Sequence, residues 1–275
     1  MPNSDNFWGR RFPDRPSLYQ QLFDTGTWEE SPTYRVTAKE PRPVVVVHGT
    51  AGARGNFNRL VPYLRTTYDG RKRRVFSVSY GNYGMADLAD SQEQIADQML
   101  ELHKKTNARS FDVVAHSQGG LQALAMASRP RAGHLVHQIV GLGADFRGVQ
   151  MPWSQLDQSH LTKFNRMVAD IVGPAFAQQV AGSPALASIL EGVGKCRVPI
   201  TQIATKYDRT VPLEAAFALA DDSELIGIKA HQGPLRLVLV QQLYPDLKIA
   251  HNMLVRHPKV AGMVKYALEH TPGEG

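Results

Sequence analysis

The chain has 275 residues, of which 43% are hydrophobic and 20% are charged, and its formal net charge at pH 7 is +6. This composition is that of an ordinary globular protein, long enough to bury one large core. The single cysteine, Cys196, excludes an intrachain disulfide and a cysteine-rich metal site. No run approaches the ~20 apolar residues that a membrane-spanning helix needs.

The positive charge is mild and gives no sign of a nucleic-acid partner. The densest basic run, residues 71–74, has no interleaved aromatic residues and precedes a strand-like segment, so we expect a solvated loop there. The first residues lack a basic segment followed by an apolar one. We therefore expect a cytoplasmic protein, or a secreted one if a signal has been removed. The sequence leaves the oligomeric state open.

The amino-terminal segment differs from the rest of the chain. Residues 1–40 carry scattered aromatics among prolines and charges without a clear period, which predicts an irregular arm before a domain at residues 41–275. The valine run at residues 44–47 is too continuous for a half-exposed strand and predicts a strand buried on both faces. It ends in a turn of small residues, where parallel-sheet folds bind ligands.

Strand-like and helix-like segments alternate after this first run. Apolar residues at helical spacing predict helices over residues 57–64 and 88–102. Further buried strands are expected at residues 75–80, 111–115, 136–142, 198–204 and 235–240. Repeated strand–helix units predict an α/β fold, with a mostly parallel central sheet and helices on both faces.

The point around which these units are organised is Ser117, between a buried run and a helical segment. A serine at the tip of so tight a turn takes a positive φ, and the residues two before and two after it must be small. Ala115 and Gly119 meet this requirement. The pattern is the G-x-S-x-G nucleophile elbow with alanine first, so we interpret Ser117 as a nucleophile rather than a helix-capping serine.

A serine hydroxyl needs a base and a third group that orients the base. Asp208 follows a late strand and is our candidate acid, with Asp145 after the preceding strand as the alternative. His251 lies beyond the last strand, and His257 is the alternative base. His257 is expected at the start of the final helix, whose dipole disfavours imidazolium, so we favour His251. The order Ser117, Asp208, His251 is that of the α/β-hydrolase triad.

The oxyanion of the reaction needs preorganised hydrogen-bond donors. The residue after the nucleophile supplies one backbone N–H, here Gln118, and the loop after the first strand supplies the other, here Thr50. Two further histidines lie next to these turns. We expect His48 to brace the oxyanion loop by a hydrogen bond, and His116 to be structural because it points away from the nucleophile's face.

The alternation of strands and helices pauses at residues 145–195, which form an insertion. Helical spacing of apolar residues predicts an amphipathic helix within it. The insertion is either a helical cap or lid over the site, or a helix packed on the core like any other, and periodicity does not distinguish the two. If it is a cap, Trp153, Phe164 and Met167 are candidate substrate-binding residues.

Together these motifs resemble the class 2 lipase family of α/β hydrolases, bacterial triacylglycerol lipases and esterases. The resemblance extends from about residue 40 to 268. It implies an α/β-hydrolase fold, a Ser117–Asp208–His251 triad and an oxyanion donor at Thr50. It also implies a cofactor-free, metal-free serine hydrolase that cleaves small-molecule or lipid esters through an acyl-enzyme. The segments that carry the resemblance are residues 43–80, the elbow at 115–120, Gly182-Ser183-Pro184, Thr205-Lys206-Tyr207-Asp208, and residues 251–268.

Two other functions remain open from the sequence. An acyltransferase would use the same residues with an alcohol in place of water. A catalytically idle binding protein could keep the fold, but the presence of every triad member argues against it. Product analysis with added alcohols separates the first alternative from hydrolysis, and a serine-reactive probe tests the second.

Overall fold

The computed structural model describes residues 34–148, 173–217 and 231–274. These residues contain a six-stranded sheet of order β2-β1-β3-β4-β5-β6, in which every pairing is parallel. The predicted α/β fold with a parallel sheet is therefore confirmed. The strands are β1 (Val44–Val47), β2 (Val75–Val78), β3 (Phe111–His116), β4 (Val136–Leu142), β5 (Ile200–Ala204) and β6 (Leu235–Leu239).

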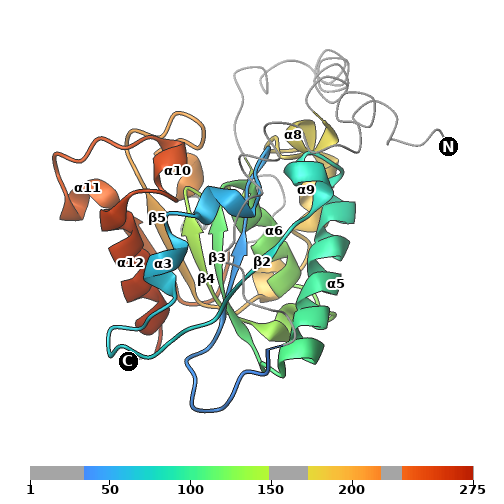
Figure 1. The fold of residues 1–275 in the computed structure, drawn as a ribbon. Helices are drawn as coiled ribbons and strands as arrows, with labels where there is room; N and C mark the ends of the chain where they lie inside the picture. Colours follow the sequence, from blue (N-terminus) through green and yellow to red (C-terminus); the bar gives the residue numbers. More distant parts are fainter. Residues whose placement is uncertain (1–33, 149–172, 218–230, 275) are drawn as a thin grey trace, which may run out of the picture.

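Helices cover both faces of this sheet. Figure 1 shows α3 and α12 on one side and α5 on the other, where α6 also packs. The α-helices are α3 (Val61–Leu64), α4 (Gly81–Gly84), α5 (Leu88–Thr106), α6 (Gln118–Ala127), α8 (Pro174–Gln178), α9 (Pro184–Ile189), α10 (Leu213–Ala216), α11 (Val240–Leu243) and α12 (Pro258–Glu269). Short 3-10 turns are η1 (Arg54–Phe57), η2 (Gly133–Leu135), η4 (Val193–Lys195) and η7 (His251–Met253).

The alternation of side chains along each strand divides the core in two. Val45 and Val47 of β1 belong to the cluster that α5 and α6 complete, whereas Val44 and Val46 belong to the cluster that α3 and α12 complete. Because both faces are covered, β1, β3 and β5 are fully buried, and β1 is a continuous apolar run. β3 and β5 are mostly apolar but also contain buried polar residues. The edge strand β6 is only half-buried.

Residues 57–64 do not form the continuous helix that their spacing predicts. The structure has the turn η1 and then the separate single-turn helix α3, which begins at Val61. Pro62 lies in the first turn of α3. Proline has no N–H to donate to a preceding turn, so a helix readily begins there but does not run through it. Phe57 and Leu64 are nevertheless both fully buried against the sheet.

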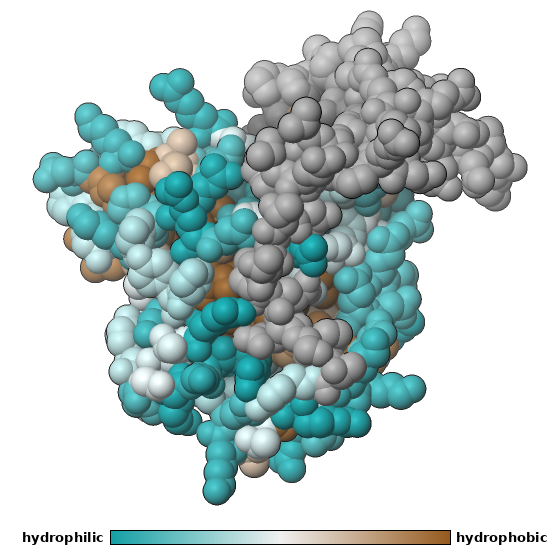
Figure 2. All heavy atoms as spheres, in the orientation of Figure 1, coloured by the Kyte–Doolittle hydropathy of each residue, from teal (hydrophilic) through white to brown (hydrophobic). Residues whose placement is uncertain are grey.

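Hydrophilic residues cover most of the described surface that Figure 2 displays. Hydrophobic residues gather near α10 and α11, where Leu243 is 59% exposed. Within the described ranges, no helix combines the length and the hydropathy needed to cross a membrane.

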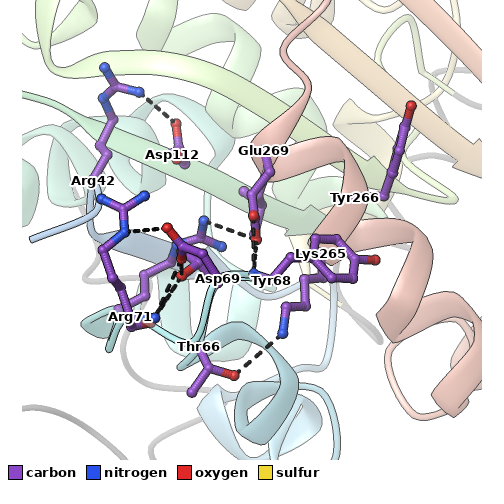
Figure 3. Close-up of polar contacts among 12 residues, drawn as sticks. Arg42, Thr66, Tyr68, Asp69, Arg71, Asp112, Lys265, Tyr266 and Glu269 are labelled. Carbon is purple, nitrogen blue, oxygen red and sulfur yellow. Dashed lines mark hydrogen bonds and ion pairs between the residues drawn. The ribbon is translucent and has the colours of Figure 1, made fainter.

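A polar cluster lies near the amino end of the sheet, opposite the strand ends that carry the candidate site (Figure 3). Asp112 of β3 is buried, and Gln138 Nε2 donates to its Oδ1 at 3.2 Å. The Arg42 guanidinium lies 3.7 Å from the same oxygen. Arg73 is also buried and pairs with Glu269 of α12 at 3.7 Å.

The basic run at residues 71–74 is therefore not uniformly a solvated loop, and that expectation is wrong for Arg73. The carboxylates of Asp112 and Glu269 favour its charge, while burial lowers its pKa. Composition alone could not indicate this, because the compensating acids come from a distant strand and from the last helix.

Asp112 gives a testable dependence of stability on pH. Burial raises its pKa to about 7, although Arg42 and Arg73 oppose the shift. Between about pH 4 and pH 7 the native state keeps a proton that the unfolded chain has released, so stability falls as pH rises through this window. Asp112→Asn removes the titration. We expect the unfolding free energy of the wild type, measured relative to this variant by urea denaturation, to fall by about 2–4 kcal/mol from pH 4.5 to pH 8. A constant difference across this range would contradict a protonated Asp112.

Candidate active site

Ser117 occupies a strained turn between β3 and α6. Its backbone has φ 54° and ψ −131°, a conformation that non-glycine residues rarely adopt and that costs about 1–3 kcal/mol. The turn is held by close backbone packing. A Cβ at Gly119 would lie 2.5 Å from the His48 carbonyl oxygen, and a Cβ at Gly49 would lie 2.7 Å from Ser117 Cβ. Only glycine fits at either position.

Asp208 and His251 form a buried pair at the same edge of the sheet. Asp208 follows β5, and His251 opens the turn η7 beyond β6. His251 Nδ1 donates to Asp208 Oδ2 at 2.6 Å. The backbone N–H groups of Thr210 and Val211 each donate to Asp208 Oδ1 at 2.8 Å and so fix the carboxylate. With its proton on Nδ1, the neutral imidazole keeps Nε2 as a proton acceptor.

The end of β4 passes directly beside this pair. Gly143 has φ 54°, and a Cβ there would lie 3.0 Å from Asp208 Oδ2 and 3.2 Å from His251 Nδ1. A side chain at position 143 would therefore push the pair apart.

Ser117 and His251 open onto one cavity of about 350 Å³. Its wall combines small, polar and apolar residues from both halves of the chain. The lining residues are Gly49, Thr50, Ala51, Asn56, His116, Ser117, Asp145, Phe176, Gln179, Thr210, Val211, His251, Asn252 and Arg256. The cavity is of the size that small-molecule sites have.

The two candidate oxyanion donors come from the two turns that meet at Ser117. Gln118 is the first residue of α6, so its N–H has no acceptor in the preceding turn of the helix. Thr50 lies in the loop after β1, and its hydroxyl accepts from Gln179 Nε2 at 3.2 Å. Gln179 Nε2 also donates to the Ala175 carbonyl at 3.0 Å, which ties the loop to α8.

His48 and Tyr80 support the same loop from beneath. Their rings stack with centroids 4.4 Å apart. His48 Nδ1 donates to the Gly49 carbonyl at 2.9 Å, and the Tyr80 hydroxyl donates to the His48 carbonyl at 2.5 Å. Burial raises the pKa of Tyr80 well above its usual range, so this phenol stays a neutral donor.

The other two candidate histidines have different surroundings. His116 Nε2 donates to the His251 carbonyl at 3.3 Å, and burial, helped by His251, lowers the pKa of His116 to about 3. His116 is thus a neutral support of His251, with the two ring centroids 4.5 Å apart. It also lines the cavity with Ser117, so the expectation that it points away from the nucleophile's face is wrong. His257 precedes α12, where its Nδ1 accepts from the Lys259 N–H at 3.2 Å. It is not among the residues lining the cavity.

Asp145 lines the cavity but does not contact His251 Nδ1, whose acceptor is Asp208. It is 1% exposed. Burial, reinforced by the Asp208 carboxylate, raises the pKa of Asp145 to about 7. Of the two candidate acids, Asp208 is therefore the one paired with the histidine.

The predicted substrate-binding residues Trp153, Phe164 and Met167 lie outside the described residues, and their role stays a prediction. The described part of the insertion has two roles. Phe176 of α8 lines the cavity, whereas α9 packs its buried residues into the core beside α5. Sequence reasoning missed Gln179 and Arg256, and it noted Phe176 only as a large apolar residue of the insertion. The partner of Gln179, Thr50, is 129 residues away in the chain. Arg256 lies close to His251 in the chain, but no motif distinguishes it from other surface arginines.

Comparison with known proteins accords with this geometry. The model of the alpha/beta hydrolase fold family matches residues 42–189, more than half of the chain. This chain belongs to that family. The match contains β1 to β4 and the elbow, and it ends before Asp208 and His251.

Solved structures of low sequence identity share the fold. Aspergillus fumigatus lipase B matches with a TM-score of 0.63 and 17% sequence identity, over 87% of this chain and 56% of the lipase. The present chain therefore spans little more than half the length of that lipase. MGS-MChE2, an alpha/beta hydrolase enzyme from the metagenome of sediments of the Mar Chica lagoon, Morocco, matches with a TM-score of 0.51 and 19% identity over 84% and 92%. A metagenome-derived lipolytic enzyme of the LipS and LipT pair matches with a TM-score of 0.54 and 14% sequence identity, over 86% of this chain and 96% of that one.

The packing of the elbow predicts the effect of adding one methyl group. In Gly119→Ala the new Cβ meets the backbone carbonyls of Val47 and His48, which cannot move without distorting β1. We expect a loss of about 2 kcal/mol or more of unfolding free energy, measured by urea denaturation. Gly262→Ala is the control, because a Cβ there meets nothing within 4 Å. Equal stability of the two variants would contradict the close packing.

Proposed function

We propose that this chain is a carboxylic ester hydrolase that works through a Ser117–His251–Asp208 triad. The observation that carries the proposal is the 2.6 Å hydrogen bond from His251 to Asp208, beside a cavity that Ser117 also lines. An activated nucleophile has three parts. They are a serine in a strained elbow, a histidine whose Nε2 carries no proton, and a carboxylate held in a fixed position.

In the acylation half of the reaction, Ser117 Oγ attacks the ester carbonyl carbon while His251 Nε2 takes the hydroxyl proton. The carbonyl oxygen becomes an oxyanion, which the backbone N–H groups of Thr50 and Gln118 would stabilise. One such donor contributes about 2.7–4 kcal/mol to the transition state. His251 then donates its proton to the departing alcohol as the C–O bond breaks, leaving an ester between Ser117 and the acyl group.

Water completes the cycle by the reverse sequence. His251 Nε2 takes a proton from the water as its oxygen attacks the acyl carbon. The resulting tetrahedral intermediate expels Ser117 Oγ, which recovers its proton from His251. Asp208 lies 2.6 Å from His251 Nδ1, where its negative charge stabilises the imidazolium formed in both halves.

The direct test is covalent labelling of the nucleophile. We expect a fluorophosphonate probe to label the wild type at Ser117 and to leave Ser117→Ala unlabelled, with peptide mass spectrometry as the readout. Ester hydrolysis by Ser117→Ala should fall by several orders of magnitude in kcat, because triad members act as a unit. Retention of more than about a tenth of the activity would exclude Ser117 as nucleophile. Added alcohols that trap the acyl group faster than water would instead favour an acyltransferase.

A second test separates the two candidate bases. His251→Ala removes the group paired with Asp208 and should reduce kcat by several orders of magnitude. His257→Ala removes only a cap of α12 and should keep activity within a few-fold, with a stability loss of about 1 kcal/mol. Initial rates on p-nitrophenyl butyrate and thermal melting of both variants provide the measurement. An inactive His257→Ala beside an active His251→Ala would reverse the assignment.

A further inference from the structure

A carboxyl group that the proposed mechanism does not use lies in the wall of the active-site cavity. Asp145 is 1% exposed and lines the cavity together with Ser117. Oδ1 of Asp145 has no hydrogen-bond partner among the described residues. The carboxyl group does form a hydrogen bond with the backbone N–H of Asp145 itself. A buried polar atom left without a partner destabilises the unliganded protein, which points to a group that arrives with a ligand.

The position of Asp145 follows from the order of the sheet. β4 lies between β3, which carries Ser117, and β5, which leads to Asp208. Asp145 therefore comes out of the sheet between the nucleophile and the triad acid. His251 Nδ1 is already paired with Asp208, so Asp145 is not needed to orient the base.

The surroundings of Asp145 separate it from the leaving-group side. Its neighbours Ala144 and Phe146 pack in the cluster on the α6 and α8 face of the sheet. Leu254 and Val255, which follow His251, pack in the cluster on the α12 face. Because His251 must reach the departing alcohol, we assign the α12 side of the cavity to the alcohol and the side of Asp145 to the acyl chain. The two kinds of hydroxylated ester compared below test this assignment.

We propose that Asp145 binds a hydroxyl group on the acyl chain of the substrate, so that the preferred esters are those of hydroxylated carboxylic acids. This inference rests on the proposed ester hydrolysis. A hydroxyl both donates and accepts, and it would give Oδ1 the partner that it lacks. A plain alkyl chain would fill the same space and leave the carboxyl unpaired.

The charges around the cavity favour a neutral hydroxyl over a cationic group. Arg256 lines the same cavity, and its guanidinium opposes the entry of an ammonium group. Burial and the Asp208 carboxylate favour the protonated form of Asp145, whose pKa is raised to about 7. Near neutral pH the carboxyl therefore both donates and accepts hydrogen bonds.

The experiment uses the chain of residues 1–275 and compares its activity on hexanoate esters with and without a hydroxyl group. Hydrolysis of ethyl hexanoate, ethyl 3-hydroxyhexanoate (each enantiomer) and ethyl 6-hydroxyhexanoate is followed by acid release. 2-Hydroxyethyl hexanoate places the hydroxyl on the alcohol instead. We expect kcat/KM for at least one hydroxyhexanoate to exceed that for hexanoate by about tenfold, with no comparable gain from the hydroxyethyl ester.

Two variants of Asp145 test the cause of this preference. Asp145→Leu keeps the branching at Cγ but makes no hydrogen bond, and it should reduce the preference to about one by lowering kcat/KM for the hydroxyhexanoates more than for hexanoate. Asp145→Asn keeps a donor and an acceptor and should retain most of the preference. Circular dichroism and thermal melting check that both fold.

Each contrary result overturns a defined part. Equal hydrolysis of plain and hydroxylated esters by the wild type overturns the inference alone, even if Asp145→Leu does not fold. A preference unchanged in Asp145→Leu also overturns it, as does an equal collapse on every ester in a folded Asp145→Leu. A wild type that cleaves no ester and takes no fluorophosphonate label overturns the proposed function, and the inference with it.

Discussion

A close contact between two backbone turns positions the candidate site. The loop after β1 and the elbow after β3 approach so closely that Gly49 and Gly119 have no room for a Cβ. This contact aligns the Thr50 loop with the first turn of α6, and the strained Ser117 is held between them. The strain persists because β3 is buried and paired on both sides, so the turn cannot relax without breaking the centre of the sheet.

The parallel sheet explains why so much of the site could be predicted from the sequence. In a parallel sheet the carboxyl ends of all strands lie at the same end of the sheet. Residues that follow different strands are therefore brought together whatever their separation in the chain. Ser117, Asp208 and His251 each follow a strand, and their order in the chain, together with the elbow motif and the family resemblance, suggested their grouping. The elbow was recognisable because its steric demand falls on residues near Ser117 in the chain, two positions before it at Ala115 and two positions after it at Gly119.

The features that sequence could not supply depend on contacts between distant surfaces. Gln179 bonds with Thr50 across 129 residues, and no spacing in either segment marks the pair. The sequence predicted that Arg73 belongs to a solvated basic run, but its side chain is buried and forms an ion pair with Glu269 of the last helix. The choice between the two acids likewise needed the distance from His251 to Asp208, since both candidates follow strands at the same edge.

Two buried carboxyl groups, those of Asp112 and Asp145, have similarly raised pKa values but different hydrogen-bond and charge partners. Asp112 lies at the amino end of β3, whereas Asp145 follows the carboxyl end of β4. Burial raises the pKa of each to about 7. Asp112 has Gln138 as a donor and Arg42 as a counter-charge, so its burial is compensated within the fold. Asp145 keeps an unpartnered oxygen beside a cavity. Among the described residues, the fold thus gives Asp112 partners of its own and leaves Asp145 without one in the cavity wall, and this difference is what the proposed role of Asp145 in substrate binding rests on.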